Sequence, residues 1–242
     1  MIKLKPLIYE IDSNKILVPR RSGPEREKRW IQEIYRKIQD YIKNGCRGNL
    51  NLNETPIKIL PDNLKEIGGS LWLSGSKIED LNNLEYVGGD LSVNNTSIKR
   101  LPDKLKKIGG SLWLDETEIE DLDNLEYIGR HLSLSNTPIK KLPDNLKRIY
   151  GSLWLDNSQI EDLNNLECVF INLNLQGTSI KKLPNNLKRI VGHLNLNNSL
   201  IEDLNNLEYV GGNLNLYNTP LSQKTTKEEI RTKIHVREHI YL

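Results

Sequence analysis

The feature that most constrains this chain is a Leu-x-Leu pair that recurs nine times, at intervals that alternate between 21 and 20 residues. The pairs begin at Leu50, Leu71, Leu91, Leu112, Leu132, Leu153, Leu173, Leu194 and Leu214. Val93 replaces the second leucine of one pair. A fixed period near 20 residues is typical of solenoids, in which each repeat buries its apolar edge only against its neighbours. We therefore expect an elongated scaffold that presents a long surface.

Each repeat supplies six apolar positions, which in the first repeat are Leu50, Leu52, Ile57, Leu60, Leu64 and Ile67. Because side chains alternate between the two faces of a strand, both leucines of a pair point inward and the residue between them points outward. Stacked pairs then form a parallel sheet. The sequence predicts a repeat solenoid of about nine short coils over residues 48–221, with a short strand or 3₁₀ turn on the second side of each coil.

Both ends of the chain depart from the repeat, as expected of segments that shield the apolar ends of a solenoid from water. We predict an N-terminal cap over residues 1–47, with an amphipathic helix over 24–44. Residues 222–242 are predicted to form a C-terminal cap. Thr225 or Thr226, with Glu228 or Glu229 three residues later, indicates a capping box that begins a short helix there.

Net charge is unevenly distributed along the chain. The total is +2, residues 1–48 carry +6 and residues 221–242 carry +2, so subtracting both ends from the total leaves −6 on the repeats. Nucleic-acid binders usually carry a basic stripe along the working face, so nucleic-acid binding is not expected. Only the Arg20-Arg21 segment favours it.

Cysteine content and hydropathy indicate the compartment. Cys46 and Cys168 are far apart in sequence, so we expect no disulfide and a reducing environment. The first residues hold no apolar run of signal-peptide length, and no stretch approaches the ~18–20 apolar residues of a membrane span. We expect a cytoplasmic protein that does not contact a membrane.

A Ser or Thr follows three residues after the second apolar residue of every pair, at Thr55, Ser76, Thr96, Thr117, Thr137, Ser158, Thr178, Ser199 and Thr219. We expect these hydroxyls to satisfy turn backbone groups of the neighbouring coil. With this ladder the chain resembles the leucine-rich repeat family over about residues 48–221. Its LPDNL segments look like the repeats of bacterial LPX-type effectors, and its Ile-Gly-Gly-x-Leu-x-Leu spacing is similar to that of receptor L domains.

Several segments also resemble uncharacterised leucine-rich repeat proteins encoded by bacteriophages, namely KLKPLIYEI, PEREKRW, GNLNLNETPIKILP and NTPLSQKTTKEEIR. None of these motifs is catalytic, and the resemblance implies no known activity. It implies a protein that acts in the cytoplasm of an infected bacterium. Binding a host protein there, including a defence protein, in order to block or redirect it is the expected task.

Charge alternates between successive repeats in two columns. One column runs Lys58, Glu79, Lys99, Glu120, Lys140, Glu161, Lys181 and Glu202; the other runs Lys65, Glu85, Lys106, Glu126, Lys147, Glu167, Lys188 and Glu208. Either column is a charged docking strip or a row of ion pairs that fixes the stacking register on a solvated face. Exposed pairs contribute about 0–1 kcal/mol each, so we favour the second interpretation.

No catalytic motif is present. The chain lacks a Gly-rich phosphate loop, a Cys-x-x-Cys pair and a nucleophile elbow. His235 and His239 are four residues apart, but no third metal ligand accompanies them. We therefore predict a protein that is not an enzyme and that uses no cofactor and no metal.

The outward positions of the predicted sheet carry a column of tryptophans. Trp72, Trp113 and Trp154 occupy the middle of their Leu-x-Leu pairs and are two coils apart, which predicts a spacing of ~10 Å. Exposed tryptophans in a row are typical interface anchors. The alternative is that each ring only covers the Ser and Asn side chains of its neighbours.

Departures from the repeat mark a second candidate surface. The first glycine of the Gly-Gly bend becomes Tyr150, Phe170 and Val191 in three successive coils. We expect these residues on the outward face beside Trp154. Further candidate contacts are Arg148, Arg189, His131 and His193. Aromatic residues rimmed by arginine are typical of protein-binding hot spots, although drift at a bend that tolerates bulk is the alternative explanation.

The sequence therefore predicts a protein-binding scaffold that occludes its partner. A carbohydrate-binding module that uses the tryptophan column is the alternative, because spaced aromatics beside Asn, Asp and Ser can stack on sugar rings.

Overall fold

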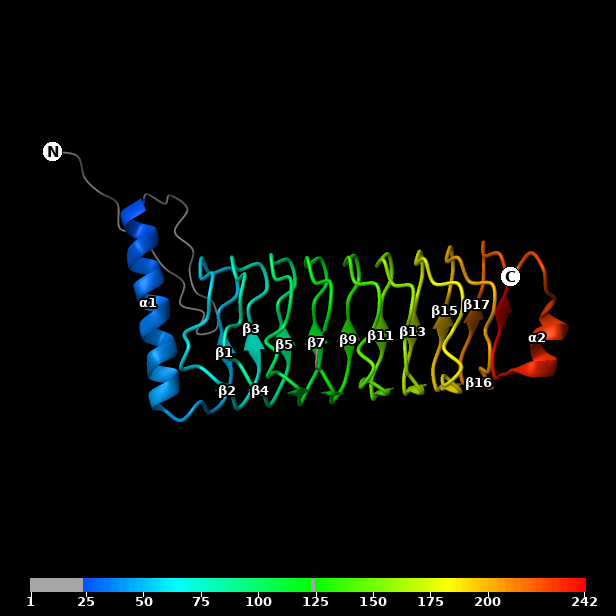
Figure 1. Cartoon of the computed structure of the whole chain (residues 1–242), viewed down its shortest axis with the longest axis horizontal. Coiled ribbons are helices and arrows are strands. Elements are labelled where there is room, and N and C mark those ends of the chain that lie inside the picture. Colours follow the sequence, from blue (N-terminus) through cyan, green and yellow to red (C-terminus); the bar gives the residue numbers. More distant parts are fainter. Residues whose placement is uncertain (1–23, 123–124) are drawn as a thin grey trace, which may run out of the picture.

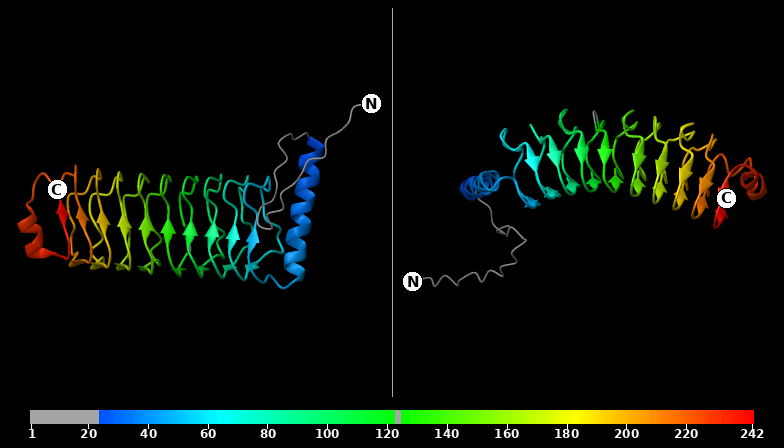
Figure 2. Two further views of the ribbon diagram at one scale, coloured as in Figure 1. Left: turned by 180° about the vertical axis from the view of Figure 1, so that it is seen from behind. Right: turned by 90° about the horizontal axis from the view of Figure 1, so that it is seen from below.

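The computed structural model describes residues 24–122 and 125–242 and shows an elongated parallel β-solenoid, as predicted (Figure 1). Helix α1 (Pro24–Lys43) lies at one end and helix α2 (Lys227–Lys233) near the other. Viewed from below, the solenoid follows a gentle arc (Figure 2). Residues 1–23 of the predicted N-terminal cap, including Arg20-Arg21, lie outside the described residues.

One long sheet runs the length of the solenoid. Its ten strands are all parallel to their neighbours, and equivalent leucines are paired, as Leu50 is with Leu71. In spatial order the strands are β1 (Leu50–Asn51), β3 (Leu71–Trp72), β5 (Leu91–Ser92), β7 (Leu112–Trp113), β9 (Leu132–Ser133), β11 (Leu153–Trp154), β13 (Leu173–Asn174), β15 (Leu194–Asn195), β17 (Leu214–Asn215) and β19 (Ile240–Tyr241). The Leu-x-Leu pairs therefore define nine of the strands, as predicted.

The second side of the coils carries short strands, in agreement with the sequence. They form two sheets. The first contains β2 (Glu66–Ile67), β4 (Tyr86–Val87), β6 (Lys107–Ile108) and β8 (Tyr127–Ile128), and the second contains β10 (Arg148–Ile149), β12 (Cys168–Val169), β14 (Arg189–Ile190), β16 (Tyr209–Val210) and β18 (His235–Val236). A bend of two residues turns the chain from each of these strands toward the next strand of the long sheet.

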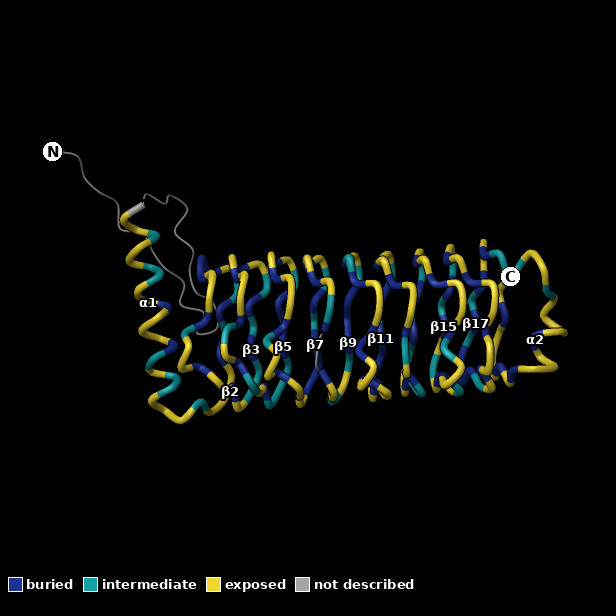
Figure 3. The backbone as a smooth tube through the Cα atoms, in the orientation of Figure 1, coloured by how far each residue is buried: buried dark blue, intermediate teal, exposed yellow. Residues whose placement is uncertain are grey.

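Apolar side chains from every coil form one continuous core. Buried residues recur along the whole length of the solenoid (Figure 3). The six apolar positions predicted from the first repeat are all at most 1 % exposed. Burying one Leu or Ile side chain contributes roughly 1.5–3 kcal/mol, so the repeated column supplies the main driving force for folding. Each coil depends on its neighbours for this burial, because a single coil has no interior of its own.

Eight of the nine hydroxyls of the buried Ser/Thr ladder bond within their own coil rather than to a neighbouring coil. Thr55 Oγ1 donates to the carbonyl oxygen of Leu52, three residues earlier, at 2.7 Å. Equivalent bonds are made by Ser76, Thr96, Thr117, Thr137, Ser158, Thr178 and Thr219. The expectation that these hydroxyls serve the neighbouring coil is therefore wrong, because the short side chain reaches the carbonyl of its own turn.

The residue before each of these hydroxyls adopts a left-handed backbone conformation. The nine residues are Glu54, Gly75, Asn95, Glu116, Asn136, Asn157, Gly177, Asn198 and Asn218, with φ between 55° and 67°. For most L residues this conformation costs roughly 1–2 kcal/mol, whereas Gly and Asn adopt it readily. The turn therefore explains why Asn or Gly occupies seven of the nine positions.

The two ends attach to the solenoid in different ways. Ile34 and Ile38 of α1 are buried in the common core. At the other end, Thr226 and Glu229 form a capping box that begins α2, as the sequence predicted. The chain then adds β18 and β19 to the sheets, which the sequence did not predict. No helix within residues 24–122 and 125–242 is long and apolar enough to span a membrane.

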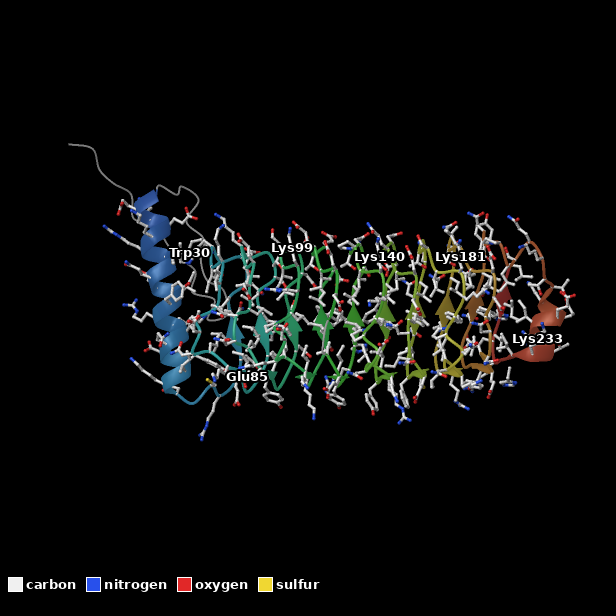
Figure 4. The ribbon with its side chains drawn as sticks, in the orientation of Figure 1. Trp30, Glu85, Lys99, Lys140, Lys181 and Lys233 are labelled. Atoms are coloured by element: carbon white, nitrogen blue, oxygen red, sulfur yellow. The ribbon has the colours of Figure 1, made fainter. Side chains whose placement is uncertain are left out.

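The charge columns form ion pairs unequally. The column on the second side pairs four times, as Lys65–Glu85, Lys106–Glu126, Lys147–Glu167 and Lys188–Glu208, at 3.1–3.9 Å. In the other column Lys58 contacts Glu79 at 2.7 Å, and Lys99 turns to Glu118 instead of Glu120. Figure 4 shows Lys99, Lys140 and Lys181 along the edge of the solenoid opposite to Glu85.

Candidate functional site

The predicted tryptophan column lies on the long sheet, in β3, β7 and β11, and its side chains are half-buried. The ring centroids of Trp113 and Trp154 are 5.6 Å apart, with 20° between the ring planes. The expected spacing of ~10 Å describes the strands but not the rings, because the two side chains lean along the sheet into a stack. Trp72 makes no ring contact with the described residues.

Polar residues lie next to the stacked tryptophans, on the strand between them and at the bend before it. The ring of His131 is 5.2 Å from that of Trp154 and 6.1 Å from that of Trp113. Ser133, which is paired with both tryptophans in the sheet, is only 4 % exposed. Stacked rings turn their faces toward each other and present their edges outward. This geometry agrees with the covering role that was one of the two explanations for the column.

His131 and His193 belong to a ladder at the corner before the long sheet. His131 Nδ1 accepts a hydrogen bond from the backbone N–H of Ser152 at 2.9 Å, and His193 Nδ1 accepts one from Asn213 at 2.9 Å. Equivalent acceptors are Asn49, Ser70, Asp90, Ser152, Asn172 and Asn213. Both histidines therefore satisfy backbone donors of the following coil, a role that the sequence analysis missed.

A second aromatic row occupies the bends that follow the second-side strands. The rings of Tyr150 and Phe170 stack with centroids 5.4 Å apart, and the ring of Tyr127 lies 5.9 Å from that of Tyr150. Phe170 is 42 % exposed and Tyr150 is 46 % exposed. We expected this row beside Trp154, which lies beyond the bend in the long sheet. Among the described residues no ring contact joins the two rows, because the bend separates their sheets.

Both arginines that were predicted as contact residues lie beside this row. Arg148, Phe170 and Arg189 line a groove of about 510 Å³, which Glu167, Cys168, Asn186 and Lys188 complete. Arg148 and Arg189 are the two sheet partners of Cys168. We name as the second-side strip the set Tyr127, Arg148, Tyr150, Phe170, Arg189 and Val191. Val191 follows β14 and is exposed.

Ion pairs in this region leave more cations than carboxylates, because Glu167 contacts two cations. Lys147 and Arg148 both contact Glu167, with nitrogen–oxygen distances of 3.9 and 3.5 Å. Lys188 pairs with Glu208 at 3.5 Å. One carboxylate therefore serves two cations at the end of the groove nearest β10.

Arg189 is the remaining cation, and within the described part of the chain it has no ion pair. Its guanidinium carbon lies 4.5 Å from the ring centroid of Tyr209, in a cation–π contact. The ring of Tyr209 in turn stacks on His235 at 5.6 Å. The three cations that line the groove, Arg148, Lys188 and Arg189, and its one carboxylate, Glu167, give it a local charge of +2 on repeats that carry −6 in total.

The thiol of Cys168 lies at the centre of the groove. Burial raises its pKa above the ordinary value, while the positive charges of Arg189 and Arg148 oppose that shift. Burial also raises the pKa of Cys46. Activated nucleophilic thiols have lowered pKa values, so the direction of both shifts is the opposite of activation.

The second side is interrupted where the strip begins. Strand β8 is not paired with β10, and within the described residues the amides of Tyr150 and Gly151 make no backbone hydrogen bond. A Cβ atom added to Gly129 would collide with the carbonyl oxygen of Gly109, which shows how closely the coils approach at this bend. Tyr150 is the first residue with a side chain at this position; Phe170 and Val191 follow it, and their amides keep hydrogen bonds to Ile149 and Val169.

The remaining chemistry-bearing residues do not gather into a site. No group of three or more His, Cys, Asp and Glu residues within 24–122 and 125–242 is arranged to hold a metal ion. His235 stacks on Tyr209, and His239 lies against Tyr241. A larger groove of about 930 Å³ is lined mainly by polar residues such as Asp162, Asn164 and Lys181.

Three members of the strip region were missed in the sequence, namely Tyr127, Cys168 and Tyr209. The signal was present, because the residue two positions before each Gly-Gly bend forms its own outward column. Its members in sheet order are Glu66, Tyr86, Lys107, Tyr127, Arg148, Cys168, Arg189, Tyr209 and His235. Aligning the repeats on the bend, rather than on the leucines, reveals it.

Neither a scan against models of protein families nor a search of curated proteins finds a match to this chain.

Proposed function

We propose that this chain is a non-enzymatic protein-binding scaffold whose contact surface is the second-side strip. The observation that carries the proposal is the exposed Tyr127–Tyr150–Phe170 row beside Arg148 and Arg189. Aromatic residues and arginine dominate binding hot spots, because large rigid rings lose little conformational entropy on contact. An exposed apolar row is costly to keep in water unless a partner covers it.

The mode of action that we propose is steric occlusion. A solenoid presents a long, nearly rigid surface, so a partner that docks on the strip is blocked over several coils. We further infer kinship with leucine-rich repeat proteins, with about nine coils between helical caps, and with those of bacteriophages. On that inference the partner is a host protein in the bacterial cytoplasm, including a defence protein.

Carbohydrate binding through the tryptophan column was the alternative. Sugar stacking needs an accessible ring face, and Trp113 and Trp154 turn faces toward each other at 5.6 Å. This geometry weakens the alternative and favours the strip.

The proposal is tested by capture of partners from lysate of a candidate bacterial host. Three baits are compared: the wild type, Tyr150→Ala/Phe170→Ala, and the matched Trp113→Ala/Trp154→Ala variant, which alters the other aromatic row. Circular dichroism verifies that each bait is folded. Proteins retained by the first and third baits but lost by the second support the strip. Equal capture by all three places the contact elsewhere, and no specific capture by the wild type rejects the scaffold in that host.

A further inference from the structure

We infer that the second-side strip binds an extended acidic segment of a partner protein, with two carboxylate side chains three residues apart and apolar residues between them. This inference rests on the proposed function and adds the chemistry of the partner. It follows from three properties of the groove: its excess of positive charge, the spacing of its arginines and the aromatic surface between them.

Charge selects the sign of the partner. Glu167 is divided between Lys147 and Arg148, and Arg189 lacks an ion pair among the described residues. Arg148 also keeps more than half of its side chain exposed, at 58 %. An incoming carboxylate at either arginine gains a charge-assisted hydrogen bond without displacing a well-formed ion pair.

Spacing selects the conformation of the partner. Arg148 and Arg189 are two strands apart in a continuous sheet, which places their backbones about 9.6 Å apart along the solenoid axis. In a β-strand, side chains on one face repeat every ~6.6–6.8 Å, which does not fit this distance. A polyproline II segment has three residues per turn and rises ~3.1 Å per residue, so its side chains on one face repeat every ~9.3 Å. Carboxylates at positions i and i+3 of such a segment therefore match the backbone spacing of the two arginines.

The surface between the arginines suits the residues between the carboxylates. Phe170 lines the groove and stacks on Tyr150, so an aromatic surface lies along the groove that contains the two arginines. Proline-rich segments dock in aromatic-lined grooves because their backbone is already extended and loses little entropy on binding. We therefore place proline or another apolar residue between the two acidic positions.

A nucleic-acid strand is the competing anionic ligand. Glu167 and Glu208 border the arginines, and the repeats carry −6 overall, so a continuous line of phosphates would meet repulsion outside the groove. A protein segment with two isolated carboxylates avoids this repulsion.

The experiment measures fluorescence anisotropy of labelled peptides with the full chain. The test peptide has the core Glu-Pro-Pro-Glu, and its controls have Glu-Pro-Glu and Lys-Pro-Pro-Lys. A short single-stranded oligothymidine is the nucleic-acid probe. Two variants are compared with the wild type. Arg148→Glu/Arg189→Glu reverses the charge at two positions of the groove. Lys140→Glu/Lys181→Glu reverses the charge of two exposed lysines that have the same two-coil spacing on the opposite edge (Figure 4).

We expect Glu-Pro-Pro-Glu to bind the wild type tightest, with affinity at least about tenfold lower for the arginine variant and altered less than about twofold for the lysine variant. Equal binding of Glu-Pro-Glu refutes the spacing. Tighter binding of oligothymidine refutes the assignment to a protein partner. If no acidic peptide binds while Tyr150→Ala/Phe170→Ala still loses a captured protein, the acidic segment is wrong and the scaffold function stands. If no acidic peptide binds and Tyr150→Ala/Phe170→Ala loses no captured protein, the scaffold function at the second-side strip fails as well.

Discussion

The left-handed turn after each strand of the long sheet predicts a stabilising substitution, Glu116→Asn. Glu116 has φ of 56° and occupies a column in which seven of nine residues are Asn or Gly. A residue other than Gly or Asn costs roughly 1–2 kcal/mol in this conformation. Asn recovers part of that cost, so we expect the free energy of unfolding to rise by about 0.5–1 kcal/mol. Asn is preferred to Gly because Gly gains more entropy in the unfolded chain.

Glu54, with φ of 56°, offers a second site for the same change. It lies three strands from Glu116, about 14 Å away, so the two increments should add. The assay is urea unfolding followed by tryptophan fluorescence. Glu120→Asn is the matched control, because Glu120 is exposed, lies outside the left-handed set and makes no ion pair within the described residues. If Glu116→Asn leaves the urea midpoint unchanged, or if the control raises it equally, the left-handed turn is not the source of the stabilisation.

Three further predictions concern other contacts. His131→Ala should destabilise the fold by about 1–3 kcal/mol, because the amide of the buried Ser152 loses its acceptor. His131→Asn should be less destabilising, since Asn accepts the same bond elsewhere in the ladder, and should lose only the ring contact with Trp154, about 0.5–1.5 kcal/mol; urea unfolding of both variants checks this. In a Cys46→Ser background, alkylation of Cys168 should be slow at neutral pH and faster at alkaline pH, because the pKa of Cys168 is raised. Arg189→Ala should raise that pKa further and slow alkylation at a fixed, mildly alkaline pH. An unchanged alkylation rate in this variant contradicts the electrostatic effect of Arg189. Trp154→Ala should cost about 0.5–1.5 kcal/mol more than Trp72→Ala in thermal unfolding, because only Trp154 stacks on another tryptophan; equal losses would show that the stack adds nothing.

The core and the direction of the strands could be predicted because both depend only on the period of the repeat. Alternation within Leu50–Leu52 sets which side chains point inward, and the spacing to Leu71 sets the parallel pairing. The same reasoning identified the capping box of Thr226, whose signature is local in sequence.

What could not be predicted depends on side-chain geometry between coils. Strand positions place Trp113 and Trp154 ~10 Å apart, but only the rotamers reveal that the rings meet. The position of Tyr150 at a corner, rather than on the face of Trp154, depends on how sharply the bend turns the chain. The strands β18 and β19 escaped prediction because residues 235–241 lack the Leu-x-Leu pair and match only the alternation.

The interruption between β8 and β10 links stability to the proposed binding surface through Tyr150. Tyr150 carries the first side chain at this bend, and the amides of Tyr150 and Gly151 make no backbone hydrogen bond among the described residues, so we predict that the Tyr150 side chain causes the interruption. Tyr150→Gly restores the residue found at Gly109 and Gly129, so the coils can close and the amides of residues 150 and 151 should exchange with deuterium more slowly.

Tyr150→Ala is the control for this effect, because it removes the ring but keeps the Cβ atom that holds the coils apart. Both variants should weaken binding of the acidic peptide, since both remove the ring that supports Phe170, but only Tyr150→Gly should slow exchange. Equal exchange in the two variants would mean that the interruption has another cause. The expected contrast would show that the bulky residue costs the sheet two hydrogen bonds and is retained for the surface that it builds, which is the trade between stability and function common at binding sites.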